Sequence, residues 1–157
     1  MAKSKKYKIE FDKIYEFDLT GKVQFGDLPE QEVYDLYKDG RVASKFLEHT
    51  VPLWFPELTF VDKRGYDHID NKEVKYDLKG FTRKSGARYA PSNMIGGNRK
   101  IDYAVLKEHA EVTNYIFSDI TEFPKVRIIF KTGEQMLNEF PSGDVKYKQR
   151  EQLFGKQ

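Results

Sequence analysis

The chain has 157 residues, of which 39% are hydrophobic and 33% charged, and its formal net charge is +2. This balance is typical of one globular domain with a hydrophobic core. The absence of cysteine excludes disulfides, zinc–thiolate sites and cysteine nucleophiles. No apolar run approaches membrane-spanning length, and the N-terminus lacks a signal-peptide pattern. We therefore expect a soluble, cytoplasmic protein without a membrane partner.

The N-terminal region predicts strands. Residues 7–11 alternate between apolar and polar types, as do residues 15–19 after a break. Residues 20–22 have turn chemistry. We therefore expect a β-hairpin or meander within residues 1–27.

Two helices are expected next. Pro29 in a first helical turn predicts a short helix that extends to about Tyr37. A second helix is expected at residues 41–51, where Pro52 should end it.

The rest of the chain predicts strands, helices and a tail. Short strands are expected at residues 58–61, 65–69 and 73–81, a helix at 101–112, central strands at 115–117 and 126–130, a short helix at 134–140 and a basic polar tail at 141–157. The order helix, three strands, helix, strand is that of an α/β (α+β) fold. The whole chain, 1–157, is expected to be one domain.

The expected strand at residues 73–81 carries Asp77 and Lys79. Residues two apart in a strand point to the same face, so these two side chains should lie together. Val74, Tyr76 and Leu78 form the apolar face that a sheet would bury.

A second acid, Asp67, lies in the preceding strand. If the two strands pair about a turn centred near Lys72, Asp67 lies opposite Asp77. Two carboxylates and one ammonium group would then converge on one face of a hairpin. Such a cluster can hold a divalent cation and orient a water molecule against a phosphate.

The pattern Asp67…Asp77-Leu78-Lys79 resembles the signature of the PD-(D/E)XK nuclease superfamily, which includes type II restriction enzymes and some homing endonucleases. The chain departs from it in having Tyr66 where the family name has proline. The resemblance implies a central mixed β-sheet flanked by helices, with an αβββαβ core like that of restriction endonucleases and a catalytic core at residues 41–120. It also implies a dependence on Mg²⁺, with Mn²⁺ as an alternative. It implies that the metal ligands are Asp67, Asp77 and the Leu78 carbonyl, and that Lys79 assists catalysis. It also implies that Glu48, from the preceding helix, is both a metal ligand and a catalytic residue.

Some of these residues have other interpretations. Lys45 lies three residues before Glu48 on the expected helix and can form an ion pair with it instead. Asp70 competes with Asp67 as the second ligand, although it should lie on the opposite strand face or cap the turn. His68 should point away from Asp67, which disfavours a zinc or general-base role.

A basic segment follows the expected catalytic strand. Residues 81–101 carry five cations and no acid, and such a distribution favours one positive face that contacts nucleic acid. The alternative is a flexible loop that caps the next helix. The expected DNA-binding residues are Arg83, Lys84, Arg88, Asn93, Asn98, Arg99 and Lys100.

The sequence therefore favours a Mg²⁺-dependent endonuclease that hydrolyses phosphodiester bonds of double-stranded DNA, sequence-specific and of restriction or homing type. A small nuclease that cuts both strands is expected to be a homodimer. The alternatives are a structure-selective nuclease for junctions or repair intermediates and a non-catalytic nucleic-acid-binding protein.

Overall fold

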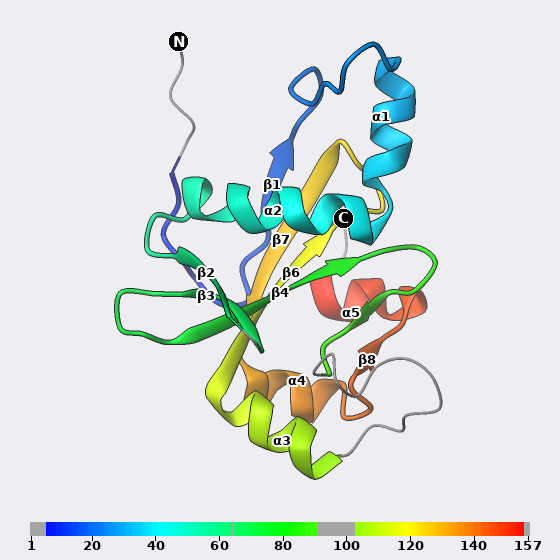
Figure 1. Ribbon diagram of the computed structural model, residues 1–157. Helices are drawn as coiled ribbons and strands as arrows, with labels where there is room; N and C mark the ends of the chain where they lie inside the picture. Colours follow the sequence, from blue (N-terminus) through cyan, green and yellow to red (C-terminus); the bar gives the residue numbers. More distant parts are fainter. Residues whose placement is uncertain (1–5, 64, 91–102, 156–157) are drawn as a thin grey trace.

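The computed structural model describes residues 6–63, 65–90 and 103–155, and a six-stranded mixed sheet crosses its centre (Figure 1). The strand order is β1-β7-β6-β4-β3-β2, in which β4 and β6 are parallel and the other neighbours are antiparallel. The strands of this sheet are β1 (Tyr15–Asp18), β2 (Thr59–Lys63), β3 (Tyr66–Ile69), β4 (Lys75–Phe81), β6 (Thr113–Asp119) and β7 (Lys125–Lys131).

Helices cover both faces of the sheet (Figure 1). Helices α1 (Glu30–Tyr37) and α2 (Gly40–Trp54) lie on one face. The other face is covered by α3 (Tyr103–Val112), α4 (Gly133–Glu139) and α5 (Arg150–Phe154). The predicted α/β class with a central mixed sheet is confirmed, and α2, β2, β3, β4, α3 and β6 occur in the expected order. Within the described ranges, no helix has the length and apolarity that crossing a membrane requires.

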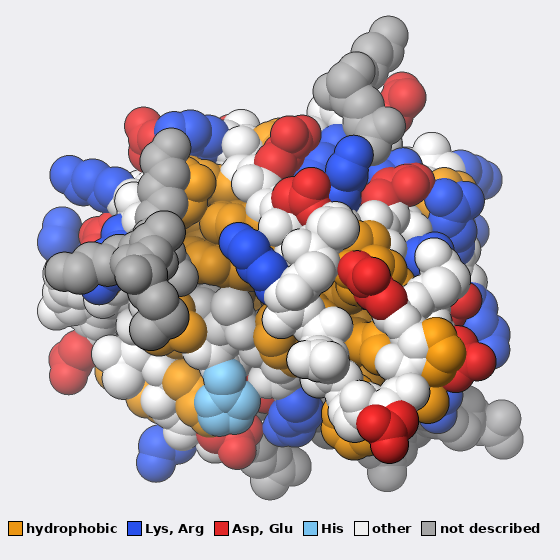
Figure 2. Space-filling model, turned by 90° about the horizontal axis from the view of Figure 1, so that it is seen from above, with side chains coloured by type: hydrophobic (Ala, Val, Ile, Leu, Met, Phe, Trp, Pro, Cys, Tyr) orange, Lys and Arg blue, Asp and Glu red, His pale blue; other side chains and the backbone are white. Residues whose placement is uncertain are grey.

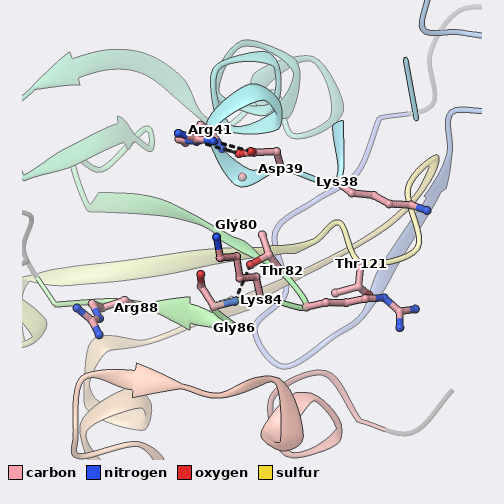
Figure 3. A pocket seen from close by; sticks show the side chains of 12 residues that line it. Lys38, Asp39, Arg41, Gly80, Thr82, Lys84, Gly86, Arg88 and Thr121 are labelled. Carbon is pink, nitrogen blue, oxygen red and sulfur yellow. Dashed lines mark hydrogen bonds and ion pairs between the residues drawn. The ribbon is translucent and has the colours of Figure 1, made fainter. Parts of the chain in front are cut away.

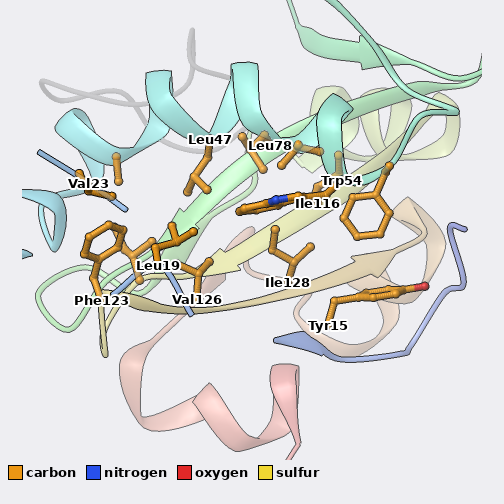
Figure 4. Close-up of a cluster of buried hydrophobic side chains, with 14 of the residues drawn as sticks. Tyr15, Leu19, Val23, Leu47, Trp54, Leu78, Ile116, Phe123, Val126 and Ile128 are labelled. Atoms are coloured by element: carbon orange, nitrogen blue, oxygen red, sulfur yellow. The ribbon is translucent and has the colours of Figure 1, made fainter. Parts of the chain in front are cut away.

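The central strands are buried on both faces, which explains their nearly continuous apolar sequences. In β6, Ile116 points into the core beneath α1 and α2, whereas Tyr115 and Phe117 belong to the core beneath α3 and α4. Figure 4 shows the first of these cores, in which Leu47 and Trp54 of α2 lie above strand residues. Successive side chains alternate between faces in a strand, so each central strand contributes to two cores.

The same alternation sets the orientation of β4. Tyr76 and Leu78 point into the core beneath α2, so Asp77 and Lys79 face the α3 side. The prediction that Val74 joins the buried set was wrong. Val74 precedes β4 and is 36% exposed, because the chain is still in the turn between β3 and β4.

The prediction that Pro52 ends the second helix was also wrong, since α2 continues to Trp54. Proline lacks the N–H that would bond the carbonyl four residues earlier, which here belongs to Glu48. The buried His68 side chain on β3 takes that place, with its Nε2 2.8 Å from the Glu48 oxygen. The additional turn positions Trp54, which stacks on Phe17 at 3.8 Å between ring centroids.

The predicted N-terminal hairpin is absent from the described residues. Strand β1 pairs with β7 instead, and residues 6–14 contain no strand. Their backbone bonds distant elements, with the Tyr7 N–H donating to the Trp54 carbonyl and the Asp12 N–H to the Phe130 carbonyl. The alternating aromatic residues pack against the core, so the pattern reflected burial and not strand pairing.

Helix α3 is buried along one face only. Leu106 and Ala110 are buried, whereas Val105 and Val112 are 38% and 60% exposed. The helix therefore contacts the sheet through the face that also carries His109, three residues after Leu106.

The C-terminal segment is part of the fold and is not a basic polar tail as predicted. Strand β8 (Asp144–Val145) pairs with β5 (Ala87–Arg88), and a 3₁₀ turn η2 (Tyr147–Gln149) leads into α5. Leu153 and Phe154 of α5 are buried in the second core. Arg150 donates to the buried Asp119 carboxylate at 2.8 Å, so burial and a buried ion pair hold this segment in place.

Candidate active site

Strands β3 and β4 bring the two predicted aspartates together. His68 lies opposite Tyr76 in the antiparallel register, so Asp67 is next to Asp77 in the same register. The Asp67 carboxylate Oδ2 accepts a hydrogen bond from the Leu78 backbone N–H at 2.9 Å. The side chain of Asp67 thus bonds a strand backbone group of β4 and is fixed beside Asp77.

Asp77 is the most constrained group of this cluster. Its Oδ2 lies 3.1 Å from Lys79 Nζ and 4.0 Å from His109 Nε2, and only 8% of the residue is exposed. Burial and the neighbouring Asp67 raise the pKa of Asp77 to about 7, although the pairing with Lys79 acts in the opposite direction. The ionised carboxylate is therefore poorly stabilised by the protein near neutral pH, and a cation here would favour it.

The Leu78 carbonyl points to the edge of β4 that faces β3 and Asp67. Within a strand, the N–H and C=O of one residue point to the same side. The Leu78 N–H reaches Asp67, so its carbonyl also faces β3. Two carboxylates and one carbonyl are hard oxygen donors of the kind that Mg²⁺ prefers, and one or two carboxylates suffice when the ion keeps waters.

Glu48 is near this cluster without completing it. Its Oε2 is buried and lies 3.3 Å from Lys45 Nζ, without a directed hydrogen bond. Burial and the charge of Asp67 raise the pKa of Glu48. In the part of the chain that the structure describes, no three acidic or histidine side chains are arranged to hold a metal ion. The structure therefore does not assemble Glu48 with Asp67 and Asp77 into a three-ligand site, because α2 packs on the opposite face from Asp77.

Asp70 has the capping role that was the alternative to metal binding. Its Oδ1 accepts the N–H groups of Lys72 and Val74 at 2.8 and 3.0 Å, and its Oδ2 accepts the Tyr76 hydroxyl at 3.0 Å. Each oxygen thus stabilises the turn between β3 and β4. His68, as expected, points away from Asp67 and bonds α2.

Two residues at the site were missed by the sequence analysis. His109 of α3 approaches Asp77 from above the sheet, and Tyr115 of β6 is paired with Asp77 in the parallel register. Burial, with Lys79 and Lys75 nearby, lowers the pKa of His109. The available signal was the position of His109 three residues after Leu106, on the buried face of an amphipathic helix.

A groove of about 900 Å³ opens beyond the cluster, at the carboxyl end of β4 (Figure 3). Asp39 and Arg41 at the start of α2 lie across from Thr82 and Lys84, which follow β4 (Figure 3). Gly80 lines the groove one residue after Lys79. The cations along its walls are Lys38, Arg41, Arg83, Lys84 and Arg88.

Two of these cations have acidic partners from distant parts of the chain. Arg83 lies 2.8 Å from Glu122, and Arg88 lies 2.7 Å from Asp144. The basic segment is therefore acid-free in sequence but not in space. The face seen in Figure 2 likewise has acidic and basic side chains interspersed. The other expected DNA contacts, Asn93, Asn98, Arg99 and Lys100, lie outside the described residues.

Comparisons with known proteins find no matching family model, no similar curated protein and no similar solved structure.

Proposed function

We propose that this chain is a metal-dependent endonuclease that hydrolyses phosphodiester bonds in double-stranded DNA. The observation that carries the proposal is the convergence of Asp67, Asp77 and Lys79 on one face of the β3–β4 pair. A partly buried pair of carboxylates beside an ammonium group combines a cation site with a group that stabilises negative charge. The resemblance to the PD-(D/E)XK superfamily supports the same conclusion.

The residues that would hold Mg²⁺, or Mn²⁺, are Asp67, Asp77 and the carbonyl of Leu78. They fit this role because they are hard oxygen donors and because Asp77 is buried with an unfavourable charge. A bound divalent ion supplies charge neutralisation at the scissile phosphate and lowers the pKa of a water molecule. Glu48 is not required as a ligand in this proposal.

Lys79 acts on the reacting groups in this proposal. Its ammonium group is held 3.1 Å from Asp77, and its side chain is 19% exposed, so it is positioned and yet accessible. A fixed cation of this kind orients the attacking water and stabilises the negative charge of the transition state. The preorganisation by Asp77 means that this interaction needs little rearrangement during the reaction.

The groove beside Gly80 is the proposed path of the DNA backbone. Lys38 and Arg41 on one wall and Arg83, Lys84 and Arg88 on the other offer phosphate-binding groups. The ion pairs of Arg83 and Arg88 are solvent-accessible, and such pairs contribute little stability. Exchanging a carboxylate for a phosphate therefore costs little. We propose a homodimer as the form that cuts both strands.

Digestion of a long random-sequence duplex tests the proposal. With Mg²⁺, we expect the purified protein to produce discrete fragments, and EDTA should abolish them. Cleavage of four-way junctions or flaps alone would instead identify a structure-selective nuclease. DNA retention without cleavage of any substrate, in Mg²⁺ or Mn²⁺, would contradict the proposal and favour a non-catalytic DNA-binding protein.

A further inference from the structure

His109 has a buried polar atom that no described group satisfies. Its Nε2 is inaccessible to solvent and has no hydrogen-bond partner in the described part of the chain. Asp77 Oδ2 lies 4.0 Å from it, which is too far for a hydrogen bond. Buried polar atoms are nearly always bonded in folded proteins, so such an exception calls for an explanation.

The ring of His109 is held in this place from two sides. A Cβ placed on Gly65, just before β3, would lie 3.7 Å from His109 Cε1. The ring centroid of Tyr115 lies 6.1 Å from that of His109. The imidazole therefore occupies a confined position between the start of β3 and the middle of β6, with Nε2 toward Asp77.

Tyr115, which is level with Asp77 on the neighbouring strand β6, carries a second unsatisfied group. Its hydroxyl is buried and has no partner among the described residues. Burial, with the charge of Asp77, raises the pKa of Tyr115, so the hydroxyl keeps its proton. A second buried polar group without a described partner thus lies level with Asp77, on the neighbouring strand β6.

His68 provides an internal contrast. The residue is fully buried, and its Nδ1 has no hydrogen-bond partner among the described residues, but its Nε2 lies 2.8 Å from the Glu48 carbonyl and connects β3 to α2. The Nε2 of His68 therefore serves the fold through a fixed backbone acceptor. The Nε2 of His109 faces instead the carboxylate of a proposed metal ligand, at 4.0 Å.

We propose that His109 is a positioning residue, which donates its Nε2–H to Asp77 Oδ2 when a divalent cation is bound at Asp67 and Asp77. This inference rests on the proposed function. Hydrogen bonds at metal ligands fix their orientation, and such bonds are often long before the ligand or substrate is bound. Lys79 and His109 would then both hold Asp77 Oδ2.

The test is the affinity of the purified protein for Mn²⁺ without DNA, measured from the electron paramagnetic resonance signal of the free ion. His109→Gln and His109→Asn form a matched pair, since both carry an amide but only glutamine reaches the position of the imidazole Nε2. We expect His109→Asn to weaken Mn²⁺ binding by about 10-fold or more. His109→Gln should stay within about threefold of the wild type. Thermal unfolding midpoints of the two variants show whether they are equally folded.

The outcomes separate the two proposals. If the wild type binds Mn²⁺ and His109→Asn binds it equally well, His109 has no positioning role and the proposed function stands. If both variants lose affinity equally, a purely structural role replaces the one inferred here. If the wild type itself takes up no Mn²⁺, the metal site fails and this inference fails with it.

Discussion

Asp77→Asn is expected to abolish Mg²⁺-dependent cleavage while making the protein more stable at pH 8. Cleavage is lost because a metal ligand is removed. Stability rises because burial raises the pKa of Asp77 to about 7, so at pH 8 the wild type carries an ionised carboxylate that the fold disfavours. The neutral amide removes this cost. A pKa difference of one unit corresponds to about 1.4 kcal/mol, so we expect a gain of about 2–4 kcal/mol in the free energy of unfolding.

The contribution of Asp77 to the stability of the wild type depends on pH. Between about pH 4 and pH 7 the folded protein binds more protons at Asp77 than the unfolded chain does, so this group makes stability fall as pH rises. The stability difference between Asp77→Asn and the wild type should therefore grow across this range and level off above pH 7. Urea denaturation at pH 5, 6 and 8 measures it. A variant that cleaves normally, or that is less stable at pH 8, would contradict the assignment of Asp77.

Asp67→Asn should lower the cleavage rate and retain the fold, whereas Asp70→Asn should lower the stability and retain cleavage. In Asp67→Asn the amide oxygen of the new side chain can still accept the Leu78 N–H, so the β3–β4 pair should be retained while the ligand charge is lost. We expect a cleavage rate lower by at least about 100-fold. Asp70→Asn removes one of the acceptors that hold Lys72, Val74 and Tyr76. It should cost about 1 kcal/mol of stability and leave cleavage nearly intact.

Single-turnover cleavage and urea denaturation on both variants provide the comparison, each variant acting as the control for the other. The assignment of Asp67 is wrong if Asp70→Asn is the inactive protein. If both variants cleave like the wild type, the site is not at the β3–β4 pair.

The placement of Asp67 beside Asp77 was predictable because it depends on local geometry. A short turn between two alternating segments fixes the register, and Asp70 caps that turn. The central strands β6 and β7 were equally predictable, since buried strands of a mixed sheet are apolar on both faces. In each case the structure follows from residues close together in sequence.

Groups that come from distant elements could not be predicted. His109 reaches Asp77 only because α3 connects the parallel strands β4 and β6 and packs over them. Likewise, Arg83 and Arg88 find their acidic partners on other segments, Glu122 and Asp144. The spacing of residues within one element can place a side chain on a buried face, but it does not specify which distant group that side chain contacts.

Other predictions failed because tertiary contacts replaced local rules. Pro52 did not end α2, since the buried His68 takes the carbonyl that proline leaves unbonded. The alternating N-terminal residues did not form a hairpin, because their aromatic side chains pack against the core and β1 pairs with β7. Burial thus outweighed the local preference at both places.

The central claim, that Asp67 and Asp77 together hold a divalent cation, is tested most directly by locating bound Mn²⁺ with nuclear magnetic resonance. Substoichiometric Mn²⁺ broadens the amide signals of residues near the ion. We predict that the signals of Asp67, Asp77, Leu78 and Lys79 broaden first in the wild type and stay sharp at the same Mn²⁺ concentration in Asp77→Asn. Broadening that is centred on another part of the chain, or that persists unchanged in the variant, would contradict the claim.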